Sequence, residues 1–129
     1  SPGGWTWVAS GCGADVTAVD RSPLDPRLMA HDRVQFIRGD AFKFQPEAPV
    51  DWLVSDVVAY PERVISLIDD WCTRRDARRM VIQMKFRGSP DWAAVTTALT
   101  KARAAGYDSR CRHLFNDRNE VTLMVAARS

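Results

Sequence analysis

The chain has 129 residues, of which 18 are Lys or Arg and 16 are Asp or Glu, so its formal net charge is +2. With 46% hydrophobic and 26% charged residues, the composition is that of an ordinary folded domain and excludes a mainly disordered chain. The length fits one domain, and the apolar-rich stretch Val50–Tyr60 is too short and too interrupted by polar residues to cross a membrane.

The first half of the chain is predicted to alternate short strands with turns. Apolar and β-branched residues predict buried strands at Ala14–Asp20, Val34–Ile37 and Val50–Ser55. Each of these strands is closely followed by, or ends in, an acidic residue. The remaining segments are a short helix at Trp5–Ser10, one helical turn within Arg21–Ala30 and a loop at Phe42–Pro49.

The next segment predicts a helix that begins at Pro61, since proline favours the first helical position. Its apolar face has helical spacing and consists of Val64, Ile65, Leu67, Ile68 and Trp71. A charged connector at Arg74–Arg79 and a strand at Met80–Met84, which leads into Lys85, are expected to follow.

A second helix is predicted with Ser89 as its N-cap, Pro90 at the first position and Asp91 complementing the helix dipole. Gly106 is expected to end it. The predicted buried stripe is Trp92, Val95, Leu99 and Ala102. The chain then closes with an antiparallel hairpin of Arg110–Phe115 and Val121–Ala127 around the turn formers Asn116–Asn119.

This alternation of strands and helices predicts an α/β fold with a mostly parallel sheet that is covered on both faces. Such sheets bind ligands in the crevice beyond the carboxyl ends of their strands. Asp20, Asp40, Asp56 and Lys85 all stand at predicted strand ends. We therefore expect these four side chains to point toward one crevice.

Each of these residues has a functional and a structural interpretation. Asp20 can bind the two hydroxyls of a ribose or cap a strand end, and Asp40 can accept from an adenine amino group or cap a turn. Asp56 and Lys85 can form a structural ion pair, or Lys85 can act as a general base. Glu120, at the start of the last strand, would complete a carboxylate cluster around Lys85.

The cysteines, arginines and tryptophans exclude fewer classes of function. Cys12, Cys72 and Cys111 form no C-x-x-C pair, which argues against a zinc site or disulfides and favours a reducing compartment such as the cytoplasm. The excess of arginine over lysine permits RNA binding but also fits an arginine-rich proteome. Trp52, Trp71 and Trp92 are expected in the core rather than stacked on bases.

Six segments, in their order and spacing, resemble one family, the bacterial 23S ribosomal RNA 2′-O-ribose methyltransferases of the RlmM type within the FtsJ-like group. The resemblance runs from Ser1 to about Val125. The segments are Ser1–Trp5 (SPGGW), Val16–Asp20 (VTAVD), Gly39–Phe44 (GDAFKF), Asp51–Asp56 (DWLVSD), Met84–Lys85 and Asn116–Thr122 (NDRNEVT).

The resemblance implies a Rossmann-like sheet that binds S-adenosylmethionine, releases S-adenosylhomocysteine and needs no metal. It implies Lys85 as proton acceptor, assisted by Asp56 and Glu120. The implied substrate is ribosomal RNA. Neither a membrane nor an obligate protein partner is expected. The residues that the resemblance assigns to cofactor binding are Pro2, Gly3, Gly4, Trp5, Asp20, Asp40 and Asp56.

The chain departs from the family at its start. The family's first catalytic lysine, its first and central strand and its RNA-binding region all lie upstream of the glycine turn. Residues 1–129 are therefore expected to be a single, amino-terminally truncated catalytic domain that lacks the first strand.

Two other functions compete with this one. A degenerate methyltransferase-like module would bind RNA or protein without catalysis, which the missing lysine favours and the retained Asp56, Lys85 and Glu120 oppose. An enzyme that uses a nicotinamide dinucleotide is disfavoured because the chain has no G-x-G-x-x-G motif.

Overall fold

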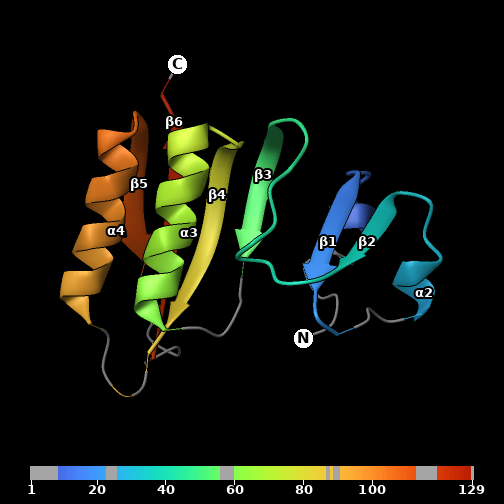
Figure 1. Ribbon diagram of the computed structural model, residues 1–129, viewed down its shortest axis with the longest axis horizontal. Coiled ribbons are helices and arrows are strands. Elements are labelled where there is room, and N and C mark those ends of the chain that lie inside the picture. Colours follow the sequence, from blue (N-terminus) through green and yellow to red (C-terminus); the bar gives the residue numbers. More distant parts are fainter. Residues whose placement is uncertain are drawn as a thin grey trace. The chain divides into compact units, whose positions relative to one another are not determined.

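A computed structural model describes residues 9–22, 26–55, 60–86, 88, 91–112 and 119–128 (Figure 1). The chain forms two compact units, Ser1–Gln45 and Pro46–Ser129. Across the described ranges, no helix is both long and apolar enough to span a membrane.

The first unit contains a parallel pair of strands, β1 (Val16–Asp20) and β2 (Val34–Arg38), in which Asp20 lies opposite Arg38. The one-turn helix α2 (Pro26–Met29) connects them and buries Leu28. These elements confirm the strands and the helical turn expected here. Residues 9–11 are helical, whereas the rest of the helix predicted from Trp5 lies outside the described residues.

The second unit is built on a four-stranded sheet with the strand order β3-β4-β6-β5. β3 pairs with β4 in parallel, and β6 runs antiparallel to both β4 and β5. The predicted carboxy-terminal hairpin is therefore confirmed. The strands are β3 (Val50–Ser55), β4 (Ala77–Lys85), β5 (Tyr107–Arg112) and β6 (Glu120–Ala127).

Two helices, α3 (Pro61–Arg74) and α4 (Trp92–Ala104), cover the same face of this sheet (Figure 1). Helices on both faces were expected. The connections β3-α3-β4 and β4-α4-β5 advance in the same direction across the sheet, and right-handed crossovers then place both helices on one side. The core beneath them consists of Val64, Leu67, Ile68, Trp71, Cys72, Ala77, Met80, Ile82, Met84, Val95, Ala98, Ala102, Tyr107, Val121, Leu123 and Val125.

The first helix agrees with its sequence pattern, but the segment after it does not. α3 begins at Pro61 and ends where Arg75 adopts a left-handed conformation, with φ of 57°. The expected connector Arg74–Arg79 is short, because β4 already begins at Ala77. Pairing with β3 and β6 extends the strand across these arginines, and the local charge pattern contains no sign of that pairing.

The second helix starts later than predicted. Asp91 is its N-cap and accepts hydrogen bonds from the backbone N–H groups of Ala93 and Ala94, so the helix begins at Trp92 and not at Pro90. Ser89 and Pro90 themselves lie outside the described residues. Gly106, with φ of +91°, follows the C-cap and confirms the predicted helix stop.

Only one of the three tryptophans expected in the core is buried. Trp71 is 4% exposed, whereas Trp52 is 54% and Trp92 is 48% exposed. Trp52 is the ladder partner of Arg79, which alternates with the buried residues of β4, so it lies on the face of the sheet opposite the helices. Trp92 stands at the first position of its helix. Their hydrophobicity predicted burial, but their positions in the tertiary structure leave them accessible.

Candidate functional site

The second unit places two of the predicted catalytic residues side by side. Lys85 is the last residue of β4 and Glu120 the first residue of β6, and the two occupy partner positions in the antiparallel ladder. Lys85 Nζ lies 3.8 Å from Glu120 Oε1. A further bond from the Phe86 N–H to the Asn119 carbonyl, 2.7 Å long, holds the two strand ends together beyond this pair.

The Lys85–Glu120 pair is partly shielded from solvent. The two side chains are 26% and 31% exposed, so they are partly shielded and still reachable by a substrate. Glu120 can orient the amine, and a neutral lysine amine can accept a proton. The pair lies at the edge of the sheet where β3 and β4 have their carboxyl ends.

Asp56, the third residue predicted for this cluster, lies outside the described residues. The strand that precedes it in the sequence, β3, is the parallel neighbour of β4. This confirms the expectation that the strands leading to Asp56 and Lys85 are adjacent.

The first unit contains Asp20, the predicted ribose ligand, at the carboxyl end of β1. Its Oδ1 accepts a hydrogen bond from the Ser22 N–H at 3.1 Å, and its backbone carbonyl accepts one from the Gly39 N–H at 3.0 Å. The side chain is exposed. Its Oδ2 accepts no hydrogen bond from the described residues, so one carboxylate oxygen shapes the turn and the other is unpaired within that part of the chain.

Asp40 follows β2 and is held more tightly. Its Oδ1 accepts from the Phe42 N–H at 2.9 Å, and its Oδ2 lies 3.2 Å from Arg21 NH2. The side chain is 15% exposed. Asp40 therefore caps the turn, which is one of the two roles expected from the sequence. The sequence pattern did not indicate its ion pair with Arg21, because the two residues are 19 positions apart.

The remaining predicted cofactor ligands, Pro2, Gly3, Gly4 and Trp5, lie outside the described residues.

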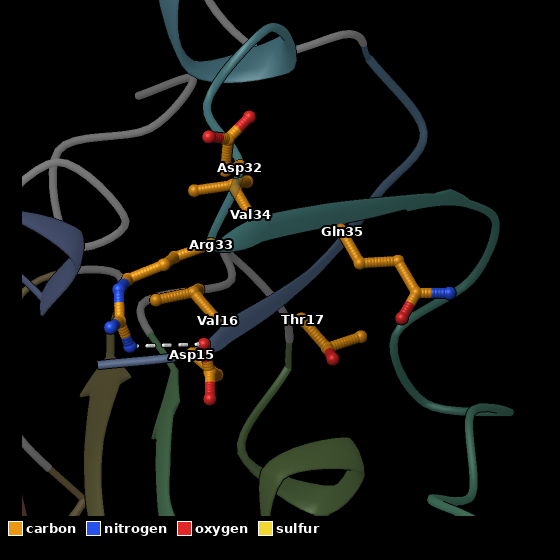
Figure 2. Close-up of a pocket in the computed structure, with 7 residues that line it drawn as sticks. All are labelled: Asp15, Val16, Thr17, Asp32, Arg33, Val34 and Gln35. Atoms are coloured by element: carbon orange, nitrogen blue, oxygen red, sulfur yellow. Dashed lines mark hydrogen bonds and ion pairs between the residues drawn. The ribbon is translucent and has the colours of Figure 1, made fainter. Parts of the chain in front are cut away.

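A shallow hollow of about 210 Å³ also lies in the first unit, at the other end of β1 and β2 (Figure 2). Arg33 crosses it and pairs with Asp15 at 3.3 Å. Ligands of parallel sheets bind beyond the carboxyl ends of the strands, whereas this hollow surrounds the residues where the strands begin. It is therefore separate from Asp20 and Asp40. Its lining consists of Asp15, Val16, Thr17, Asp32, Arg33, Val34 and Gln35.

Among the described residues of the second unit, Cys72 and Tyr107 have raised pKa values, and both side chains are buried in the core. Burial, with a smaller contribution from Asp69, raises the pKa of the Cys72 thiol to about 12. Burial likewise raises the pKa of Tyr107. A thiol that stays protonated is a poor nucleophile, so Cys72 is a packing residue.

No model of a known protein family matches the chain. Curated relatives do match it over its whole length. The chain is 37% identical to ribosomal RNA large subunit methyltransferase M of Aromatoleum aromaticum, with 100% of this chain and 36% of the relative aligned. The protein of the same name from Laribacter hongkongensis is 39% identical, over 98% of this chain and 37% of the relative.

Over almost its whole length, the chain is similar to part of ribosomal RNA large subunit methyltransferase M. It spans about a third, 36%, of the length of the Aromatoleum aromaticum relative. This confirms the family resemblance that the six sequence segments indicated.

Solved methyltransferases share the fold. The magnesium protoporphyrin IX methyltransferase of Synechocystis, solved with S-adenosylhomocysteine, has a TM-score of 0.58 at 10% identity, over 95% of this chain and 80% of that one. The methyltransferase domain of bacterial CtHen1-C has a TM-score of 0.58 at 12% identity, over 89% and 78%. The Rossmann-like methyltransferase fold class is confirmed, and at such identities the likeness concerns the fold alone.

Proposed function

We propose that the protein transfers a methyl group from S-adenosylmethionine to a ribose 2′-hydroxyl of ribosomal RNA, with Lys85 as the proton acceptor. The observation that carries the proposal is the Lys85–Glu120 pair, 3.8 Å apart at the carboxyl edge of the sheet. The pair occurs in a chain that is similar over its whole length to ribosomal RNA large subunit methyltransferase M.

Two carboxylates of the first unit fit a nucleoside cofactor. Asp20 is exposed at a strand end and has an oxygen available for ribose hydroxyls. Asp40 is mostly buried, and the Phe42 N–H and Arg21 hold its orientation. Asp20 is the proposed ribose ligand and Asp40 the proposed acceptor from the adenine amino group. Bound there, S-adenosylmethionine would supply an electrophilic methyl carbon, and its transfer from sulfur to the ribose oxygen would leave S-adenosylhomocysteine.

Lys85 handles the proton in this proposal. A ribose hydroxyl is a weak nucleophile at neutral pH, so the attacking oxygen needs a base. The neutral amine of Lys85 takes the hydroxyl proton and becomes an ammonium. Glu120, beside the amine, orients it and stabilises the charge that forms. Holding the hydroxyl against the base contributes to the rate as well, since the reaction is bimolecular in solution.

A Lys85→Met substitution tests the proposal. The chain is incubated with S-adenosylmethionine and ribosomal RNA, and the digested RNA is analysed for methylated nucleosides by mass spectrometry. We expect a 2′-O-methylnucleoside from the wild-type chain. We expect the Lys85→Met variant to lose about 10²–10⁴-fold in rate, the usual contribution of a general base, while cofactor affinity by calorimetry stays within about twofold.

Lys101→Met is the matched control, because Lys101 Nζ lies 3.8 Å from Asp69 Oδ2 in an equally long ion pair on the helices. It should keep full activity. A methylated base instead of a methylated ribose would contradict the specificity. A Lys85→Met variant with a normal rate would contradict the proton-acceptor role. Cofactor binding without transfer by the wild-type chain would favour the alternative function, a binding module.

A further inference from the structure

The face of the four-stranded sheet that the helices leave open contains two arginines on its edge strand. Arg110 and Arg112 lie on β5, the last strand in the order β3-β4-β6-β5, and both are exposed. Between them Cys111 faces the helices and is partly buried. Because side chains alternate along a strand, the two guanidinium groups project from the same face, with roughly 7 Å between their Cα atoms.

The strand register places this face in line with the catalytic pair. Arg112 is the ladder partner of Thr122, which lies two residues along β6 from Glu120, and Glu120 is the partner of Lys85. Ladder partners share a face, so Arg110, Arg112 and Lys85 project from the same side. β5 and β4 both run antiparallel to β6, so Arg112 and Lys85 also stand at the same edge, with roughly 12 Å between their Cα atoms.

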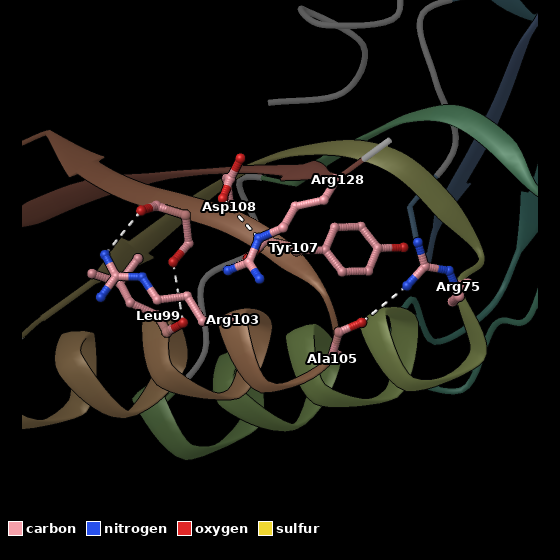
Figure 3. Close-up of polar contacts among 8 residues, drawn as sticks. Arg75, Leu99, Arg103, Ala105, Tyr107, Asp108 and Arg128 are labelled. Atoms are coloured by element: carbon pink, nitrogen blue, oxygen red, sulfur yellow. Dashed lines mark hydrogen bonds and ion pairs between the residues drawn. The ribbon is translucent and has the colours of Figure 1, made fainter.

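Among the described residues, neither of these two arginines is paired with a carboxylate. The acidic residue of the same strand, Asp108, accepts a 2.9 Å hydrogen bond from Arg128 Nε (Figure 3). Another arginine of the open face, Arg79, is stacked 5.5 Å from the centre of the Trp52 ring.

We propose that Arg110 and Arg112 bind backbone phosphates of the RNA strand whose ribose is presented to Lys85. The guanidinium group matches phosphate oxygens in a bidentate geometry and remains charged at any working pH. Phosphate contacts set the register of a nucleic acid without reading its sequence. The inference rests on the proposed function and adds the surface that positions the substrate. The competing explanation is that the charges only protect an exposed strand edge from aggregation.

The test is a salt titration of RNA binding. A labelled single-stranded oligouridylate is the probe, and its affinity is measured by fluorescence anisotropy for the wild-type chain and for Arg110→Gln, Arg112→Gln and the double variant. Arg78→Gln is the control, because Arg78 is also exposed but lies near the start of β4, at the opposite end of the sheet. Circular dichroism establishes that all variants are folded.

Each phosphate contact with single-stranded nucleic acid adds about 0.7 to the slope of log affinity against log salt. We expect the slope to fall by about 0.7 in each single variant, by about 1.4 in the double variant and not at all in Arg78→Gln. In the methyl-transfer assay, the double variant should raise the KM for RNA and leave kcat unchanged.

Unchanged slopes in the β5 variants, or an equal loss in Arg78→Gln, would overturn this inference. Its failure can be distinguished from that of the proposed function. If the wild-type chain transfers methyl groups but the β5 variants keep the wild-type salt slope, only the phosphate-site inference is refuted. If the salt slopes of the β5 variants fall but the wild-type chain transfers no methyl group, the RNA-binding surface is supported and the enzymatic proposal is refuted.

Discussion

Arg75 and Tyr107, 32 positions apart in the sequence, are stacked against each other, with the Arg75 guanidinium carbon 5.1 Å from the centre of the Tyr107 ring. The same guanidinium donates a 2.9 Å hydrogen bond to the Ala105 carbonyl (Figure 3). Arg75 therefore ties the end of α3 to the turn between α4 and β5. This contact closes the helical layer at the end of the sheet opposite Lys85.

Tyr107→Phe should destabilise the protein by about 1–2 kcal/mol, because it removes one partner of a buried hydrogen bond. The Tyr107 hydroxyl donates to the Ala77 carbonyl at 2.7 Å, and its side chain is 1% exposed. The free energy of unfolding in urea measures the effect. Tyr60→Phe is the control, since Tyr60 is 65% exposed and should change the stability little. Equal effects of the two substitutions would contradict the assignment.

Gly106→Ala should also destabilise the fold, by about 1–2 kcal/mol, the cost of a left-handed conformation for a residue with a side chain. Gly106 has φ of +91°, and an added Cβ would lie 3.2 Å from the Arg75 guanidinium. Thermal unfolding measures the loss. Gly11→Ala serves as the control, because a Cβ at Gly11 would meet no atom within 4 Å. A Gly106→Ala protein as stable as the wild type would refute the prediction.

Asp20→Ala should weaken the binding of S-adenosylmethionine by about 1.5–3 kcal/mol, the usual value of a hydrogen bond to a charged group. Calorimetric titration measures it. Asp15→Ala is the matched control, because Asp15 precedes the same strand at its other end and its side chain is 87% exposed. An affinity unchanged by Asp20→Ala would place Asp20 outside the cofactor site.

Because of Cys72, the free energy of unfolding should decrease at alkaline pH. The pKa of Cys72 is raised from 9.0 to about 12 in the folded protein, so between these values the unfolded chain binds fewer protons than the folded one. The stabilising contribution is complete below pH 9 and decreases as the pH rises toward 12. Urea unfolding across this range should therefore show a steeper decline for the wild type than for Cys72→Ala. Cys12→Ala, which alters an exposed thiol, should keep the wild-type slope.

The sequence alone predicted the elements whose signals are local. The apolar spacing that begins after Pro61 indicated α3, and Gly106 indicated the end of α4, because helical spacing and glycine at a helix stop depend on neighbours only a few residues away. The order of short segments also indicated the family. Their positions at predicted strand ends indicate Lys85 and Glu120 as candidate catalytic residues, and the resemblance supports that interpretation.

The tertiary structure determined the features that depend on pairing between strands far apart in the sequence. Lys85 and Glu120 meet because β4 and β6 pair in one register, and β4 starts at Ala77 because β3 lies beside it. The exposure of Trp52 followed from the side of the sheet on which both helices pack. Sequence periodicity determines which residues share a face of one element. Strand order and crossover handedness determine which face is covered, and they are properties of the whole fold.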